Sequence, residues 1–392
     1  MNEKRRHFEA SEYHSRQQKT RAAMVSKGID LLLVTDPANM NWLTGYDAWS
    51  FYTHQCVVIG TDDTLFWFGR GIDYSGAIAT TDLTQNEIVA YSDDYVQSTK
   101  RHPMQYLAVI LKERNLTNAV IGVEKDNYYF SALAAEVLYK KLPDTKFTDA
   151  TALVNWQRAI KSPKEIEYMR GAGYIIESTY KRILDIAQPG MRKNDLVAEI
   201  IQSNTQGVDG YFGDYTSIVP LMGTDDEAGT CHLTWNSDEL RPNSGLFFEL
   251  AAAHKRYHCP CSRTFYFGQP PPKYIDMEKI INEGINNTLD LFKPGNSCGE
   301  VALSFHNTLK KYGYEKDSRY GYAIGMSYLP DWGERTMSIR ISDKTELQEG
   351  MTFHFIPAMW LDDLSFEMTE SVLVTDKGAA CLSQVPRKLF VK

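Results

Sequence analysis

Residues 245–264, GLFFELAAAHKRYHCPCSRT, contain two β-rich runs that predict the two strands of a central hairpin. Side chains of a strand point alternately to the two faces of its sheet. On the second strand His258 therefore shares a face with Pro260, and the sulfur atoms of Cys259 and Cys261 point to the opposite face. No second cysteine pair follows in the sequence, so we do not expect these thiols to bind a metal.

Glu249 stands inside the first strand, between apolar residues on both sides. A buried carboxylate without a partner is costly, so a glutamate at this place needs a reason. Two interpretations are open. The residue is either one half of a buried salt bridge or a functional carboxylate.

The composition of the chain is that of a globular protein, with 392 residues and a formal net charge of −8. This length is enough for two or three domains with a large core. No run approaches the roughly eighteen apolar residues of a membrane helix, and the charged N-terminus lacks the apolar segment of a secretion signal, so we expect a cytoplasmic protein. The negative charge argues against nucleic acid as a partner. The six cysteines are expected to be reduced thiols.

The chain is expected to contain two domains. Short β-rich runs alternate with helical segments in the first part, which predicts an α/β domain. A long helix should begin after Ser162, because Pro163 and Glu165 complete the N-cap, first-turn proline and capping-box pattern. We therefore predict an N-terminal domain of residues 1–158 and a C-terminal domain of residues 159–392.

The C-terminal part contains a faint internal repeat: LDIAQPG at 184–190 recurs as LDLFKPG at 289–295. Each copy is followed by a second helix with an N-cap and then by β-rich sequence. Two such units predict a pseudo-twofold α+β domain with one pocket between the halves of its sheet. The alternative is a chance recurrence of Pro-Gly helix stops.

The hairpin at 245–264 resembles that of the pita-bread hydrolases, the superfamily of creatinase, prolidase and methionine aminopeptidase. The resemblance implies an α/β N-terminal domain followed by an α+β pita-bread catalytic domain. The two aspartate metal ligands of that hairpin, eleven residues apart, are here Glu249 and Pro260. Two further ligand positions hold Tyr322 and Ile356, and Glu370 stands one place out of register in the last strand. Since these changes remove the donor set of a catalytic dication, we expect neither a metal nor another cofactor.

The same resemblance implies the catalytic residues. Creatinase works without metal through a histidine before the first strand, and His232 lies seventeen residues before Glu249. Imidazole can donate or accept a proton near neutral pH, which suits His232 for proton transfer. Glu249 is expected to act as a nucleophile or as a general base, and His258, on the ligand face, is the third catalytic candidate. The alternatives are that His232 is a loop residue and that His258 is a hydrogen-bonded structural histidine.

Several strings in the chain are similar to the ectoine hydrolases of this superfamily, which open the cyclic amidine of ectoine to N-acetyl-2,4-diaminobutyrate. They include WSFY at 49–52, HLTW at 232–235, KRYHCP at 255–260 and DWGERTMS at 331–338. An amidinium is planar and cationic, so its site needs a carboxylate and aromatic faces. The substrate's own carboxylate needs a cation, for which Arg335 is the candidate. The expected substrate-binding residues are Phe51, Trp49, Tyr52, Tyr257, Tyr322, Trp332, Arg335 and Glu370.

The segment WSFYTH at 49–54 is too aromatic for an exposed loop. In creatinase-like proteins the N-terminal domain covers the pocket of a partner subunit, and Phe51 falls at the position that touches substrate there. The resemblance thus implies a homodimer with shared active sites. A deacetylase is a candidate second partner, whereas neither nucleic acid nor a membrane is expected.

Three other functions stay open at this point. A creatinase-like hydrolase of guanidino or amidine compounds is weakened by Thr53, which stands where an arginine would be expected. An Xaa-Pro metallopeptidase is opposed by the lost ligands. A non-catalytic binding scaffold is opposed by the presence of both His232 and Glu249.

Overall fold

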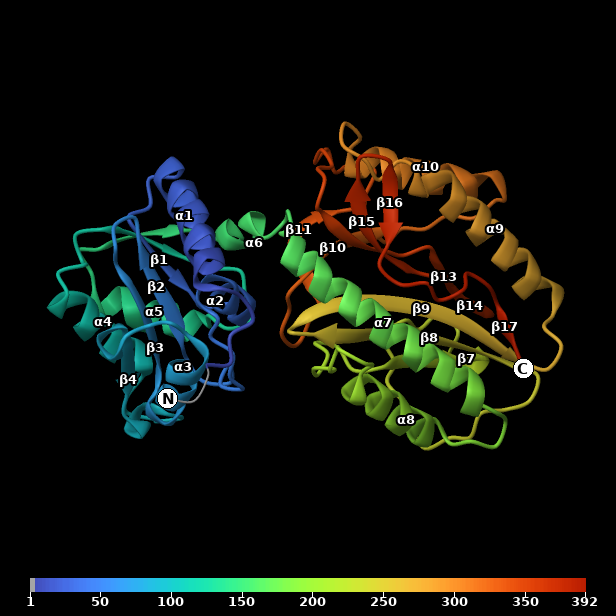
Figure 1. Ribbon diagram of the computed structural model, residues 1–392, viewed down its shortest axis with the longest axis horizontal. Coiled ribbons are helices and arrows are strands. Elements are labelled where there is room, and N and C mark those ends of the chain that lie inside the picture. The colour runs from blue at the N-terminus through green and yellow to red at the C-terminus, as the bar shows by residue number, and fades with distance from the viewer. Residues whose placement is uncertain (1–3) are drawn as a thin grey trace. The chain divides into compact units, whose positions relative to one another are not determined.

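The computed structural model describes residues 4–392, and the chain divides into two compact units, Met1–Arg158 and Ala159–Lys392 (Figure 1). Each unit combines helices with β-sheets, as the predicted fold class requires. Among residues 4–392 no helix is both long and apolar enough to cross a membrane.

The first unit is built on a six-stranded mixed sheet with the order β4-β3-β2-β1-β5-β6. The central strand β1 pairs antiparallel with β2 and parallel with β5, so both neighbours bury it. The apolar runs at residues 31–35, 56–60 and 65–68 predict three of these strands, β1, β2 and β3. The strands are β1 (Leu31–Val34), β2 (Cys56–Gly60), β3 (Leu65–Arg70), β4 (Ile88–Tyr91), β5 (Val120–Val123) and β6 (Lys146–Asp149).

The helices of the first unit pack on this sheet. Leu107 and Leu111 of one helix and Leu138 of another join strand residues in a single apolar core. The sequence predicts three helices here, at residues 12–27, 102–114 and 130–142. They correspond to α1, α4 and α5, whose ends differ from the prediction by about two residues at most, the usual uncertainty of a helix boundary. The helices are α1 (Ala10–Ser26), α2 (Pro37–Thr44), α3 (Tyr74–Thr80), α4 (Pro103–Glu113), α5 (Ala132–Lys141) and α6 (Leu153–Gln157).

The second unit begins with helix α7 (Pro163–Ile186), whose start has the predicted capping box. The Ser162 hydroxyl accepts a hydrogen bond from Glu165 N, and the Glu165 carboxylate accepts one from Ser162 N at 2.8 Å. Helix α8 (Lys193–Gln206) follows, and the pair α9 (Pro272–Leu289) and α10 (Cys298–Lys311) repeats the arrangement. The two helix pairs confirm the repeat found in the sequence.

A long hairpin forms the centre of the second unit. Strands β8 (Ser244–His254) and β9 (Tyr257–Phe267) pair antiparallel, and β7 (Leu221–Thr224) and β17 (Phe390–Val391) complete a four-stranded sheet. The two turn residues Lys255 and Arg256 have φ of 48° and 68°. This is the backbone of a tight two-residue turn, which usually contains glycine or asparagine. Here Arg256 is held by its neighbours, because its N–H donates to Asp214 and its guanidinium covers the Tyr215 ring.

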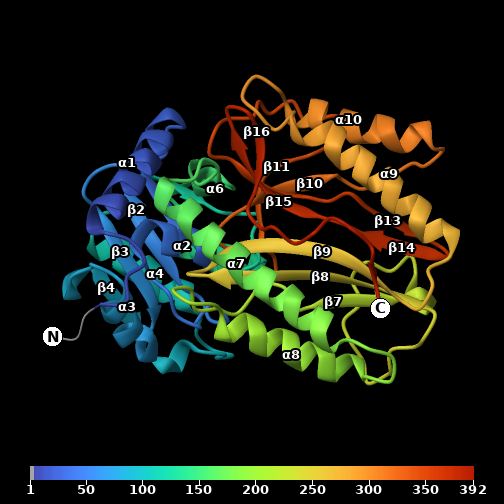
Figure 2. The same ribbon diagram turned by 45° about the vertical axis from the view of Figure 1, so that its right-hand side comes forward.

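A second sheet of this unit has the order β11-β10-β12-β15-β16. Phe353 and Phe355 of β12 pack against Phe292 and Phe305 on the side of α9 and α10. In Figures 1 and 2, α7 and α8 lie along the β7–β9 sheet, and α9 and α10 lie along this second sheet. Its strands are β10 (Gly321–Ile324), β11 (Gly333–Ser338), β12 (Thr352–Phe355), β15 (Glu370–Thr375) and β16 (Gly378–Cys381), and β13 (Ala358–Leu361) pairs with β14 (Leu364–Glu367) beside it.

The two sheets meet along β9 and β15. The Ser371 hydroxyl donates to Pro260 O at 2.7 Å, Ser262 N donates to the Thr369 hydroxyl at 2.9 Å, and Thr369 N donates to Ser262 O. These bonds tie the inner faces of both sheets together. The inner faces of the two sheets therefore lie against each other at these residues.

Candidate active site

Glu249 lies in the middle of β8 and faces Ser262 across the hairpin, so both side chains share the inner face of the sheet. It is only 8% exposed, and no residue of the described chain donates a hydrogen bond to it. Burial raises the pKa of Glu249 well above its usual value, and the nearby carboxyl of Glu367 raises it further. Among residues 4–392 Glu249 forms no salt bridge, so the structure does not support its interpretation as one half of a buried ion pair.

Glu367, at the end of β14, is the second carboxyl of the site. Its Oε1 accepts a hydrogen bond from Trp360 Nε1 at 2.7 Å, and burial raises its pKa to about 7. Its other oxygen, Oε2, is buried beside the Ser262 hydroxyl, which lowers that pKa, yet neither atom reaches hydrogen-bond geometry with any described residue. An acceptor of this kind is available for the N–H groups of a ligand.

Lys316 supplies the positive charge. It lies in the loop between α10 and β10, and its Nζ is 4.2 Å from the centre of the Trp360 ring. Burial lowers the pKa of Lys316 to about 8, while Glu367, Cys231 and Glu249 hold it up. Two buried carboxyls and one buried ammonium thus influence one another across this space.

Sequence reasoning missed both Glu367 and Lys316. Glu367 follows Ser365 and Phe366 in a strand-like string and precedes the equally buried Glu370 by three residues. The two differ in their partners, because Glu370 pairs with Arg263 whereas Oε2 of Glu367 has no hydrogen-bond partner among the described residues. Lys316 lies in the polar segment KYGYEKDSRY at 311–320, where nothing in the sequence distinguishes a buried site lysine from an exposed one.

A chain of polar side chains connects the other predicted positions. Trp332 Nε1 donates to the Tyr322 hydroxyl at 2.7 Å, which lies 3.3 Å from Nδ1 of His354. Nε2 of His354 is 2.7 Å from the Thr369 hydroxyl. Tyr322 belongs to the same site as Glu249, because burial and then the Glu249 charge raise its pKa well above the usual value. Burial lowers the pKa of His354 to about 3, so this imidazole is neutral.

His258 also points to the inner face, as predicted, but both of its ring nitrogens are occupied. Nε2 accepts from Ser217 N at 3.0 Å, which leaves the proton on Nδ1 for Arg256 O at 2.9 Å. Burial lowers the pKa of His258 to about 3. This environment favours a structural histidine, and the catalytic role of His258 stays a prediction.

His232 lies in the exposed loop between β7 and β8. Its Nδ1 is 3.6 Å from the sulfur of Cys231, whose thiol pKa is raised by burial and then by Glu367 and Glu249. The loop therefore borders the two carboxyls, although the imidazole itself faces solvent. The proton-transfer role of His232 stays a prediction.

Tyr257 and Glu370 are not brought to Glu249. Tyr257 lies on the opposite face of β9 from His258 and donates to Glu165 of α7 at 2.7 Å. Glu370 is buried and accepts a hydrogen bond from Arg263 Nη2 at 2.7 Å in an ion pair. Their surroundings are those of structural residues and do not support the expected contact with substrate.

Arg335 lies half-buried on β11, where φ of 56° puts a non-glycine residue in the left-handed region and the pairing with β10 is irregular. Such a backbone costs about 1–3 kcal/mol, and strained residues cluster at functional sites. The predicted contact of Arg335 with the substrate carboxylate stays a prediction.

The three remaining predicted residues lie in the first unit. Trp49 and Phe51 contact each other with ring centroids 4.9 Å apart, and Phe51 meets Tyr129 at 6.0 Å. Tyr52 accepts a hydrogen bond from Arg70. Trp49 is 56% and Tyr52 61% exposed, so the aromatic segment is not buried within the single chain.

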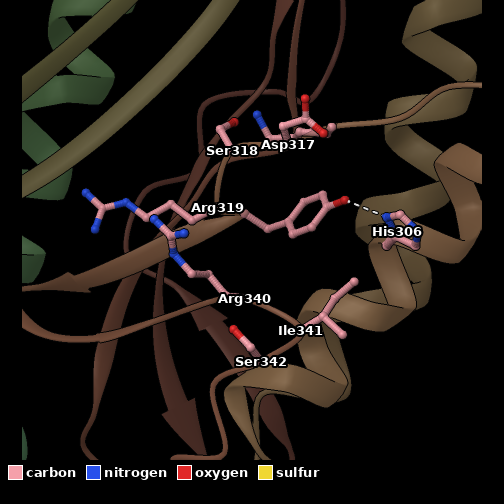
Figure 3. Close-up of a pocket in the computed structure, with 9 residues that line it drawn as sticks. His306, Asp317, Ser318, Arg319, Arg340, Ile341 and Ser342 are labelled. Atoms are coloured by element: carbon pink, nitrogen blue, oxygen red, sulfur yellow. Dashed lines mark hydrogen bonds between the residues drawn. The ribbon is translucent and has the colours of Figure 1, made fainter.

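A pocket of about 420 Å³ opens beside Lys316. Its lining is mostly basic and polar, and Figure 3 shows the side chains of Arg319 and Arg340 extending to the same side while His306 bonds to the Tyr320 hydroxyl. Arg319 also covers the ring of Tyr322, with Cζ 4.1 Å from its centre. The pocket therefore adjoins the site that contains Tyr322 and Glu249.

Comparisons with known proteins identify the family of the chain. Residues 167–376 match metallopeptidase family M24, and residues 16–160 match the creatinase/prolidase N-terminal domain. The chain belongs to the M24 family of the creatinase/prolidase superfamily. It is 48% identical to the ectoine hydrolase of Halomonas elongata over 98% of both chains, and 41% identical to an uncharacterised hydrolase/peptidase of Sinorhizobium fredii over 98% of this chain and 99% of that one. The prolidase of Thermococcus sibiricus has the same fold, with a TM-score of 0.84 at 19% identity over 97% of this chain and 99% of that one.

The M24 family implies a metal, and the residues present do not fit one. Pro260 and Ile356 have no side-chain donor atom, and the hydroxyls of Tyr322 and Thr369 are already used by Trp332, His354 and Ser262 N–H. Over residues 4–392, no group of three His, Cys, Asp or Glu side chains is arranged to hold a metal ion. A single glutamate at the old ligand position cannot replace that set.

The raised pKa of Glu367 predicts a pH-dependent stability. Because the folded state holds the proton up to about pH 7, Glu367 stabilises the fold fully below its unfolded pKa, and this contribution is lost as the pH rises through 7. Glu367→Gln removes the titration, so we expect the variant to gain about 1–3 kcal/mol over the wild type on going from pH 5 to pH 8.

Thermal unfolding of both proteins at several pH values measures this gain. The exposed Glu349→Gln variant controls for the loss of a charge. Parallel wild-type and Glu367→Gln curves over this range would contradict the shifted pKa.

Proposed function

We propose that this protein hydrolyses ectoine by opening its cyclic amidine to an N-acetyl-2,4-diaminobutyrate, without a metal ion. The observation that carries the proposal is the buried pair Glu249 and Glu367, in which Glu249 receives no hydrogen bond within the described chain and Glu367 Oε2 is also unpartnered. A planar cation with N–H donors fits such a pair better than a neutral amide does. The 48% identity to the Halomonas elongata ectoine hydrolase supports the same substrate.

The cation of the substrate would change the protonation of the pair. Near neutral pH the two carboxyls hold at least one proton between them, because burial raises the pKa of both and the charge of Glu367 raises the pKa of Glu249 further. An amidinium placed against them favours the carboxylate form, so one group becomes a base while the other keeps a proton. The pair then contains one carboxylate that can act as a base and one carboxylic acid that can donate a proton, both next to the amidine carbon of the substrate.

The reaction needs an electron pair at the amidine carbon and a proton on the leaving nitrogen. In our proposal Glu249 provides the first, by taking a proton from attacking water or by attacking the carbon itself, and the carboxylic acid of Glu367 provides the second. Addition of water and cleavage of one C–N bond convert the amidinium into an amide and an ammonium group. No net proton is consumed.

The surrounding side chains support this chemistry. Tyr322 and Trp332 are hydrogen-bonded to each other, and the Tyr322 hydroxyl stays neutral. They can therefore offer aromatic surface to the amidinium and leave its ion pairing to the carboxyls. Burial of the carboxyls strengthens their interaction with a cation, since little water is present to screen it.

The first test is turnover. Purified protein should convert ectoine, and Glu249→Gln should lower kcat/KM by about 10²- to 10⁴-fold, because the variant loses the electron-pair donor while keeping the shape of the side chain. Chromatography or NMR of the product measures the rate, and Glu349→Gln serves as the exposed control. Turnover of creatine or an Xaa-Pro dipeptide with ectoine inert would overturn the proposal.

The second test is metal dependence. Dialysis against a strong chelator should leave the rate unchanged, because Pro260, Tyr322 and Ile356 have replaced three ligands of the family's metal site. Elemental analysis of the same sample completes the measurement. A rate that falls on chelation and returns with Mn²⁺, Co²⁺ or Zn²⁺ would show that the enzyme uses a metal.

We also propose that the protein works as a homodimer in which Phe51, with Trp49 and Tyr52, covers the site of the partner subunit. The exposure of Trp49 and Tyr52 in the single chain supports it, since large aromatic side chains in contact with one another are seldom left in water. The compartment of the protein and a deacetylase partner remain expectations from the sequence.

Subunit complementation tests the shared site. Inactive Glu249→Gln and Phe51→Ala chains, mixed under conditions that allow exchange, should regain activity, because one of the two sites in each mixed dimer is intact. Up to about half of the wild-type activity per mixed dimer is expected if the sites act independently. Mixed dimers that stay inactive although exchange is demonstrated, or an active monomer, would refute it.

A further inference from the structure

Lys316 has a buried ammonium group without a hydrogen-bond partner among residues 4–392. An ammonium carries three N–H donors, and burying them unpaired costs free energy that packing alone does not return. The side chain is also outside ion-pair distance of every carboxylate in the described chain: no acidic oxygen lies within 4.0 Å of its Nζ. A group in this state is suited to an anionic ligand.

The surroundings of Lys316 define where that ligand would lie. Trp360 stands between the two charges of the site, because its ring faces Nζ of Lys316 at 4.2 Å while its indole N–H donates to Glu367 Oε1 at 2.7 Å. Trp360 therefore contacts both the ammonium of Lys316 and the carboxyl of Glu367, which do not form an ion pair with each other. A small zwitterion has the same pattern of a positive and a negative end.

The pocket in Figure 3 gives a ligand a route to Lys316. Lys316, Arg319 and Arg340 line its 420 Å³, with Asp317 as the acidic residue among the lining side chains. A mostly basic lining raises the local concentration of anions. Since Arg319 also covers Tyr322, the anion-attracting pocket and the carboxyl pair are neighbouring parts of one site.

We propose that Lys316 binds the carboxylate of the substrate and thereby selects amidines that carry one. This assignment rests on the proposed function and extends it to substrate selection. Arg335 was the candidate from the sequence, but Lys316 is the cation that lowers the pKa of both Glu249 and Glu367. The substrate would then lie with its amidinium at the carboxyls and its carboxylate at Lys316.

A comparison of two ligands tests the assignment. Ectoine has the carboxylate, and a 2-methyl-tetrahydropyrimidine has the same amidine ring without it. Lys316→Met should lower kcat/KM for ectoine by about 10- to 100-fold, the size expected when a charge-assisted hydrogen bond is lost. The inhibition constant of the ring without carboxylate should change by less than about threefold, because that ligand never contacts Lys316.

Two further variants serve as controls. Lys310→Met removes an exposed positive charge of α10 that does not line the pocket, and it should leave the preference for the carboxylate within about threefold of the wild type. Lys316→Arg keeps the charge and should retain more of the preference than Lys316→Met, and melting temperatures show whether each variant is folded.

The outcomes are distinguishable. If wild-type protein does not hydrolyse ectoine, the proposed function fails. If the wild type is active but Lys316→Met weakens both ligands by the same factor, Lys316 acts on the carboxyl pair alone and the assignment is overturned. A loss confined to ectoine in folded Lys316→Met supports it.

Discussion

The structure of the second unit depends on how it accommodates the buried carboxyl of Glu249. Glu249 receives no hydrogen bond from the described chain and lies near Glu367, which is buried more completely. Two carboxylates in low dielectric repel each other and lose their hydration, so the fold tolerates them only as a partly protonated pair with Lys316 nearby. Hydrogen bonds between β9 and β15 hold the protein around this pair, and most of them use backbone atoms that cannot move away.

Neutral, hydrogen-bonded side chains surround the positions at which the M24 family implies metal ligands. Tyr322, His354 and Thr369 satisfy one another, and burial keeps His354 uncharged. In a metalloenzyme a dication balances the carboxylates, whereas here only Glu249 remains of the acidic set at the aligned ligand positions. The residues at these positions thus carry less negative charge than a dication needs, and a single positive charge is enough to balance Glu249.

Much of the architecture could be predicted from the sequence because it depends on patterns that extend over only a few residues. The capping box at Ser162, the repeated Pro-Gly helix ends and the β-rich runs around Glu249 each act over a few residues. The face of His258 followed from strand alternation alone. The site was harder, because Glu367 and Lys316 reach Glu249 only through tertiary packing of segments more than fifty residues away.

The need for tertiary contacts also applies to two residues that the sequence predicts as substrate contacts. Tyr257 and Glu370 stand next to inner-face residues in the chain, but one step along a strand turns a side chain to the other face. Tyr257 therefore meets Glu165 of α7, and Glu370 meets Arg263. A motif fixes which strand carries the chemistry, and the pleat of that strand decides which of its residues can take part. Glu249 passes both conditions, with a place in the family's hairpin and a side chain on its inner face, and this is why the site is built around it.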